Sequence, residues 1–139
     1  WYQYALENRD TTQLCVCMTL SPLNIFYIDR MIEYVEELNN KFKDNILTLY
    51  LNLVHGPAHY NISYIPNYYK EAVTKKLSPL IKKNHYLESI LQFMNNGIHN
   101  EAHWKEFKKQ TKLSDEYRNQ SFRLCFPEIQ ELMENNGDV

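Results

Sequence analysis

Five polar side chains lie where two apolar segments of the sequence end. Thr19, Ser21 and Asn24 close the first segment, and Asn52 and His55 close the second. Hydroxyl, carboxamide and imidazole groups donate and accept hydrogen bonds, so this set has the chemistry to bind a polar cofactor or substrate. The chain has no phosphate-binding loop, nucleophile elbow or glycine-rich dinucleotide turn. We therefore predict no catalytic residue, and the ends of the two segments are candidate positions for binding a ligand.

Two of the five residues also have a structural interpretation. Asn24 stands just before a helical pattern and is a candidate N-cap for that helix. Asn52 lies within an apolar strand, where its carboxamide is either satisfied by a neighbouring backbone group or directed at a ligand. The sequence leaves both alternatives open.

Two pairs of histidines have a four-residue spacing that could bring metal ligands together. His55 and His59 are separated by a Gly-Pro sequence, which is incompatible with a regular helix. Between His99 and His103 the acidic residue is Glu101, whereas the metalloprotease pattern requires glutamate directly after the first histidine. We therefore predict surface histidines and no metal site.

Cysteine usage and hydropathy indicate the compartment. The three cysteines are Cys15, Cys17 and Cys125, an odd number without metal-type spacing, which argues against a disulfide framework. Cys15 and Cys17 share one face of a predicted strand, and we expect both to be buried as small apolar side chains. No apolar run approaches the roughly 20 residues that span a bilayer. We predict a cytoplasmic protein without a membrane segment.

The sequence around the polar residues predicts a strand–helix–strand unit. Residues 14–20 form an apolar strand, a helical pattern follows over about 26–40, and a second apolar run covers 46–54. Continuously apolar strands around one amphipathic helix are typical of parallel strands with both sheet faces covered. Ligands of such sheets bind at the carboxyl ends of the strands, where the five polar residues fall.

The remainder of the chain has helical patterns. Asn67 is the predicted N-cap of one helix, a second helix covers 85–96 and is closed by Gly97, and Asn100 caps a longer third helix. Phe126, which is followed by proline, starts a short last helix.

These elements define the predicted fold class as α/β, with few parallel strands and four or five helices. We expect a single domain or domain fragment over 1–139, with the strand–helix–strand unit in 1–66 and a helical C-terminal part in 67–139. The chain starts abruptly at Trp1 in what resembles the end of a helix. We therefore expect it to be a piece of a longer protein.

One predicted helix carries a basic face. Lys105, Lys108, Lys109 and Lys112 line one side of it, opposite aromatic residues. This arrangement is typical of a solvated face above a core face. A nucleic-acid footprint would have more positive charge and some arginine, so we expect no nucleic-acid binding.

Two stretches of the sequence resemble a known family. The first runs from Met18 to Ile28 and continues with Leu51-Asn52-Leu53-Val54-His55-Gly56-Pro57. The second includes Asp115-Glu116-Tyr117-Arg118-Asn119-Gln120-Ser121-Phe122 and ends in Phe126-Pro127-Glu128. Together they resemble the C-terminal half of radical SAM proteins of the twitch-domain kind, known from bacteria and their phages.

This resemblance implies a late segment of a partial (β/α) barrel. It places Thr19, Ser21 and Asn24 near the pocket for S-adenosylmethionine, and it places Asn52 and His55 near cofactor or substrate. The family's radical reaction needs a [4Fe–4S] cluster held by a Cys-x-x-x-Cys-x-x-Cys loop, which this sequence lacks. The chain alone is therefore expected to bind no cofactor and to be inactive, although S-adenosylmethionine and [4Fe–4S] are implied for a full-length relative.

Half a barrel would leave sheet edges exposed, which favours a homodimer through strand pairing. The alternative function is a stand-alone, non-catalytic α/β module that binds a partner or a small ligand.

Overall fold

The sheet consists of two parallel strands joined by a helix. The structure, a computed structural model, describes residues 1–43 and 45–138. Within these ranges β1 (Leu14–Leu20) pairs in parallel with β2 (Leu47–Leu53), and α2 (Ile28–Phe42) connects the two. The predicted parallel strand–helix–strand unit is confirmed, whereas its membership of a barrel stays a prediction.

The rest of the described chain is mostly helical. The structure has seven α-helical segments within the described ranges, more than the four or five predicted, because segments as short as α6 show no readable periodicity. Besides α2, the α-helices are α1 (Tyr2–Glu7), α3 (Asn67–Leu77), α4 (Tyr86–Asn96), α5 (Glu101–Arg118), α6 (Phe122–Cys125) and α7 (Pro127–Asn135). The 3₁₀ helices are η1 (Ile25–Tyr27), η2 (Ala58–Tyr60), η3 (Ile62–Tyr64) and η4 (Ser78–Lys83). None of the described helices is both long and apolar enough to cross a bilayer.

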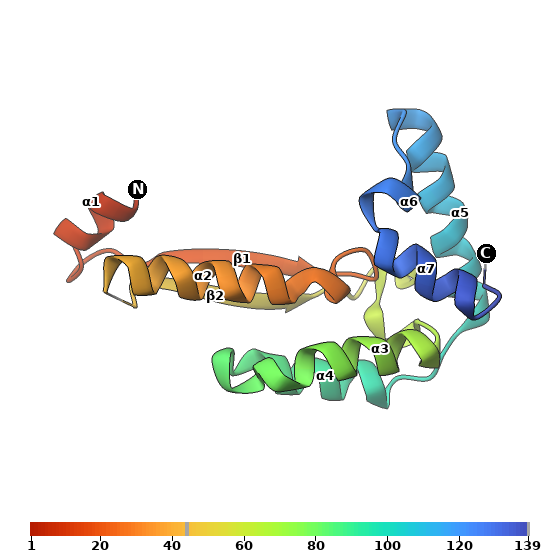
Figure 1. Ribbon diagram of the computed structural model, residues 1–139, viewed down its shortest axis with the longest axis horizontal. Coiled ribbons are helices and arrows are strands. Elements are labelled where there is room, and N and C mark those ends of the chain that lie inside the picture. Colours follow the sequence, from red (N-terminus) through yellow and green to blue (C-terminus); the bar gives the residue numbers. More distant parts are fainter. Residues whose placement is uncertain (44, 139) are drawn as a thin grey trace.

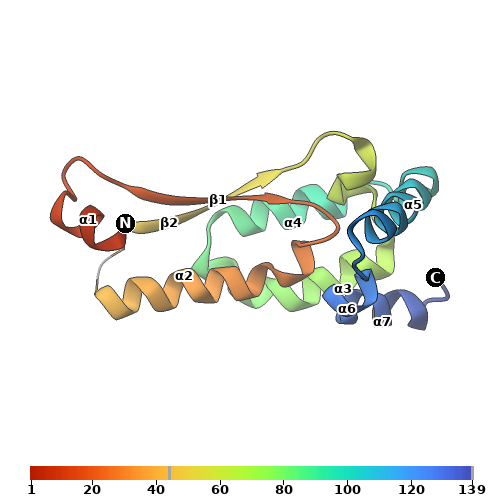
Figure 2. The same ribbon diagram turned by 90° about the horizontal axis from the view of Figure 1, so that it is seen from above.

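The helices are distributed unevenly around the sheet. Figure 1 shows α5, α6 and α7 grouped beyond the carboxyl ends of the strands, with α1 at the opposite end of the molecule. Figure 2 shows α2, α3 and α4 on the same side of the two strands. The sheet therefore has one covered face.

The residues on the two faces differ accordingly. Leu20, Leu49 and Leu51 are at most 7% exposed on the covered face. Cys15 and Cys17 lie on the other face, which we call the open face, and both are exposed. The predictions that both faces are covered and that these cysteines are buried are wrong, because the described chain supplies helices to one face alone.

One hydrophobic core joins the two parts of the chain. On α2 the buried residues Ile28, Ile32 and Val35 recur at spacings of four and three, which turns one stripe of the helix toward the core. Trp104 and Phe107 of α5 stack at a ring-centroid distance of 4.8 Å and belong to the same cluster. Burying a large apolar side chain stabilises a fold by roughly 1.5–3 kcal/mol. The helical part therefore contributes directly to holding the sheet unit in place.

The two asparagines predicted as helix caps have different outcomes. Asn100 precedes α5, and its side chain accepts a hydrogen bond from His103 N at 3.1 Å, as predicted. Asn67 does not cap α3, because Pro66 occupies the N-cap position and Asn67 is the first helical residue. Sequence position thus identified both helix starts to within one residue but only one capping side chain.

Candidate functional site

The carboxyl ends of the two strands place two of the predicted residues side by side. Thr19 of β1 is directly opposite Asn52 of β2, and both side chains are exposed on the open face. The Asn52 carboxamide makes no hydrogen bond within the described chain, so no neighbouring backbone group satisfies it; because it is exposed to water, its ligand-directed role stays a prediction. His55 follows β2, is exposed, and contacts Phe93 of α4 in a T-shaped arrangement with 5.9 Å between ring centroids. A hydroxyl, a carboxamide and an imidazole are therefore available at this end of the sheet.

Ser21 and Asn24 shape the loop that follows β1. Asn24 Oδ1 accepts a hydrogen bond from Ser21 N at 2.9 Å, and Asn24 Nδ2 donates one to Thr19 O at 2.9 Å. Ser21 Oγ accepts from Leu23 N at 3.3 Å. Asn24 stands at the start of η1 but makes no capping hydrogen bond to it, so the predicted capping role is wrong. Both side chains hold the loop, and a role of the five residues in binding stays a prediction.

Two asparagine side chains bond the first part of the outer edge of β2. Asn39 of α2 bonds Leu47 as a neighbouring strand would: its Nδ2 donates to Leu47 O at 2.9 Å and its Oδ1 accepts from Leu47 N at 3.1 Å. Asn84 Nδ2 donates to Leu49 O at 3.2 Å. Unpaired backbone groups of an edge strand offer a template for another strand, and these two carboxamides occupy those of Leu47 and the carbonyl of Leu49. The outward backbone groups of Leu51 and Leu53 have no hydrogen-bond partner among the described residues.

The outer edge of β1 is open over most of its length. Leu20 O accepts a hydrogen bond from Val54 N at 3.3 Å, so Leu20 and every second residue before it direct their backbone groups at β2. The backbone N–H and C=O groups of the intervening residues Cys15 and Cys17 point outward, and no described residue forms a hydrogen bond with them. Thr19 O also points outward, and a loop side chain occupies it. Both edges therefore keep outward backbone groups that a further strand could bond, at Cys15 and Cys17 on β1 and at Leu51 and Leu53 on β2.

The cysteines are not arranged to hold a metal cluster. Cys15 and Cys17 lie on β1, whereas Cys125 is the last residue of α6. Within residues 1–43 and 45–138, no three His, Cys, Asp or Glu side chains converge as metal ligands do.

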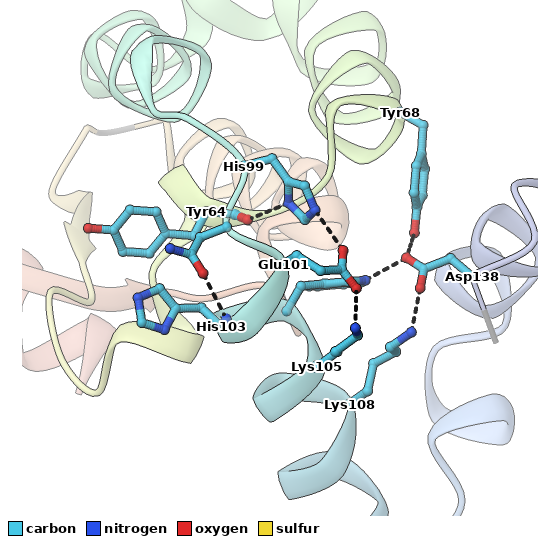
Figure 3. A network of polar contacts seen from close by, with 10 residues as sticks. Tyr64, Tyr68, His99, Glu101, His103, Lys105, Lys108 and Asp138 are labelled. Atoms are coloured by element: carbon cyan, nitrogen blue, oxygen red, sulfur yellow. Dashed lines mark hydrogen bonds and ion pairs between the residues drawn. The ribbon is translucent and has the colours of Figure 1, made fainter.

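Figure 3 shows a polar network around α5 that sequence patterns did not indicate. Asp138 accepts hydrogen bonds from Tyr68 Oη at 2.6 Å and from Trp104 Nε1 at 2.5 Å. It also pairs with Lys108 Nζ at 2.5 Å. Burial alone would raise the pKa of Asp138, but the three donors hold it below its ordinary value. This network fastens the end of the described chain to α3 and α5.

The histidines near the start of α5 belong to a second group of contacts in the same view. His99 Nδ1 lies 2.9 Å from Tyr64 O, and His99 Nε2 lies 3.1 Å from a Glu101 carboxylate oxygen. Hydrogen bonds from His99 and Lys105 lower the pKa of Glu101. The His103 ring packs on the Tyr64 ring at 4.9 Å. Both histidines are half-buried in contacts between η3 and α5, rather than lying free on the surface as predicted.

A cavity of about 360 Å³ lies at the other end of the sheet, beside the amino end of β2. Part of its polar lining is already committed: Asn39 and Asn84 bind the β2 backbone, and Glu36 pairs with Lys83 at 2.6 Å. None of the five predicted residues lines it. We therefore assign this cavity no role in the candidate site.

Comparison of the chain with protein-family models, with curated proteins and with solved structures returned no match.

Proposed function

We propose that this chain supplies late strands of a (β/α) barrel of the radical SAM kind and is inactive by itself. One observation carries the proposal: helices cover one face of the parallel sheet, the other face is bare, and the outward backbone groups of Cys15 and Cys17 on β1 have no hydrogen-bond partner among the described residues. In a (β/α) barrel the helices form the outer layer and the inner faces of the strands meet across the interior. An upstream strand would pair with β1 along the backbone of Cys15 and Cys17.

The open face would then line the barrel interior. Barrels bind their ligands at the carboxyl ends of the strands, which is where Thr19 and Asn52 stand side by side. A hydroxyl and a free carboxamide can hydrogen-bond the amino-acid and ribose groups of S-adenosylmethionine. His55 would stand at the rim. These three residues provide part of a site, and the remaining contacts would come from upstream strands.

The cysteines of this chain do not suit a [4Fe–4S] cluster. Cys15 and Cys17 are held on one strand, and Cys125 is on α6. The resemblance requires three cysteines on one loop, which the sequence lacks. We therefore assign no step of a radical reaction to residues of this chain.

Titration of the labelled protein with S-adenosylmethionine, followed by NMR, tests the site. The sequence predicts no cofactor bound by this chain alone, whereas the exposed Thr19 and Asn52 lead us to expect weak binding. We expect shifts in the backbone amide signals of Thr19, Asn52 and His55, with a dissociation constant of about 1 mM because these residues provide only part of a site. Asn52→Ala should remove these shifts. Asn40→Ala should leave these shifts in place. It deletes another exposed carboxamide, which lies near the carboxyl end of α2 and away from Thr19 and Asn52. Shifts confined to other regions, or none at all, would contradict the proposal.

The open edge of β1 leads to a prediction about self-association. Without an upstream strand, we expect two copies to pair through β1 and to elute as a dimer in light-scattering chromatography under reducing conditions. Cys17→Pro removes one outward N–H and leaves the bonds to β2 intact, so it should shift the protein to monomer. Cys17→Ser changes the side chain alone and should remain dimeric. A wild-type monomer at all concentrations would count against an accessible edge.

The second candidate function is a stand-alone module that binds a small ligand without iron. A mostly apolar cavity of about 300 Å³ between α5, α6 and α7, lined by none of the five predicted residues, favours this candidate. A monomer that does not bind S-adenosylmethionine but binds another small molecule would support this candidate.

A further inference from the structure

Two exposed thiols lie next to each other on the open face of the sheet. Cys15 and Cys17 are separated by one residue of β1, so their side chains point to the same face. Both are exposed, and neither forms a disulfide. Sulfur is a soft ligand for metal ions, and exposure makes this pair accessible to an ion from solvent.

The strand holds these two thiols too far apart for a disulfide but close enough for a shared ion. Residues two apart on a strand are separated by about 6.6 Å, and side chains on one face stand roughly parallel. A disulfide needs Cβ atoms about 3.5–4.5 Å apart. An ion between two sulfur atoms, with metal–sulfur bonds of about 2.3 Å, holds the sulfur atoms about 4.6 Å apart. Because each sulfur lies one bond beyond its Cβ, inward-leaning rotamers reach this separation without bending the strand.

The number of ligands at this position restricts the kind of ion. Within residues 1–43 and 45–138, no third His, Cys, Asp or Glu side chain joins the two cysteines. Their neighbours across the sheet, Thr48 and Tyr50, carry hydroxyl oxygens, which are hard ligands. Structural zinc sites and most iron–sulfur clusters are held by four protein ligands. A pair of thiolates therefore suits a soft ion that accepts two ligands.

We propose that Cys15 and Cys17 together bind one Cu(I) ion as a two-coordinate thiolate site. Both S–H bonds break, the two protons pass to solvent, and two Cu–S bonds form. Copper stays Cu(I) throughout, and no electron is transferred. Soft sulfur ligands favour Cu(I) over the harder divalent ions. Both ligands come from β1, so the site does not rest on the barrel assignment or on S-adenosylmethionine.

Anaerobic titration of the full chain with Cu(I), in competition with the chromogenic chelator bathocuproine disulfonate, tests the site. We expect one Cu(I) per chain and an X-ray absorption spectrum with two sulfur neighbours. Binding should weaken as the pH falls, because each Cu(I) displaces two protons. Zn(II) should bind at least roughly a hundredfold more weakly, since two thiolates leave half of its coordination sphere to water. No uptake of Cu(I), one Cu(I) per two chains, or three sulfur neighbours would overturn the assignment.

Cysteine variants distinguish the pair from thiols in general. Cys15→Ser and Cys17→Ser should each weaken Cu(I) binding at least roughly a hundredfold, because one of the two bonds to the metal is lost. Cys125→Ser removes the exposed thiol at the end of α6 and should leave the affinity unchanged. Cys17→Ser combined with Thr19→Cys keeps two thiols on the same face of β1 but about 13 Å apart, so it should bind as weakly as Cys17→Ser. Wild-type affinity in this double variant, or a loss with Cys125→Ser, would disprove the assignment.

Discussion

Gly97→Ala is expected to destabilise the protein by about 3 kcal/mol, because a side chain at this position has no room. A Cβ atom on Gly97 would lie 2.4 Å from Ser63 O and 2.5 Å from Ser63 Cβ. The φ angle of Gly97 is −70°, which any residue can adopt. The reason for glycine is therefore the close approach of two backbones, and the left-handed conformation that glycine often takes after a helix is not involved.

The segment around Ser63 cannot move away from Gly97 without losing buried hydrogen bonds. Lys70 Nζ donates to Ser63 O at 2.8 Å and to Gly97 O at 2.7 Å, and so ties the two backbones together. Its side chain is buried, and this burial lowers the pKa of Lys70. A third bond, from Asn100 N to Tyr64 O at 3.1 Å, joins the same two segments one residue after Ser63 and three residues after Gly97. Widening this gap would leave buried donors and acceptors without partners.

Thermal and urea unfolding measure the effect. Gly97→Ala should lower the melting temperature by about 10 °C. Gly56→Ala is the matched control, because nothing lies within 4 Å of a Cβ added there, and it should change stability by less than about 0.5 kcal/mol. Ser63→Gly combined with Gly97→Ala should restore part of the loss, since it removes one of the close atoms and leaves Ser63 O. A Gly97→Ala protein as stable as wild type would disprove the close approach.

The strand–helix–strand unit could be predicted because its signals are local. The second strand reads Leu47-Thr48-Leu49-Tyr50-Leu51-Asn52-Leu53, with leucine at every second position. This period of two indicates a strand with one buried face. Interpreting the same run as continuously apolar led to the wrong expectation of two covered faces. The same error placed Cys15 and Cys17 in the core.

The side chains that bond backbone groups of distant segments could not be predicted, because these contacts form between residues far apart in the sequence. Asn84 meets Leu49 from 35 positions away, and a lone asparagine before a helix has many possible roles. Lys70 looks like a surface lysine on α3, yet it is 4% exposed and bonds two backbone carbonyls from other segments. Each of these contacts depends on how elements pack, and residue type alone does not encode that.

In the candidate site, too, the positions of residues along the chain could be predicted, whereas their contacts could not. The position of Thr19 and Asn52 near strand ends followed from the apolar runs, but their direct pairing depends on the strand register. Ser21 and Asn24 were correctly placed after β1. Their mutual hydrogen bonds arise from the loop conformation, and no periodic pattern predicts them.

Asp138→Asn is expected to release the end of the chain from α3 and α5. The carboxylate accepts hydrogen bonds from Tyr68 and Trp104 and pairs with Lys108, and Asn cannot replace all three contacts. We expect a loss of about 2 kcal/mol. Trp104 is 2% exposed, so its fluorescence should shift to longer wavelength when this segment leaves. The other tryptophan, Trp1, is 95% exposed and is best replaced by Phe in the variants that are compared.

The same contact predicts a pH dependence that distinguishes Asp138 from general acid unfolding. Its pKa in the folded protein lies below the ordinary value of about 3.9, so its stabilising contribution is complete above about pH 4 and is lost as the pH falls through the lower folded-state value. Trp104 fluorescence should therefore be constant at higher pH and shift in strong acid, whereas Asp138→Asn should show the shifted signal already at neutral pH. Glu128→Gln is the control, because Glu128 bonds Tyr27 at 2.6 Å and Arg30 at 2.9 Å and does not touch Trp104. If Glu128→Gln moves the Trp104 signal as much as Asp138→Asn does, α7 is released as a whole and Asp138 has no separate role in holding the chain end.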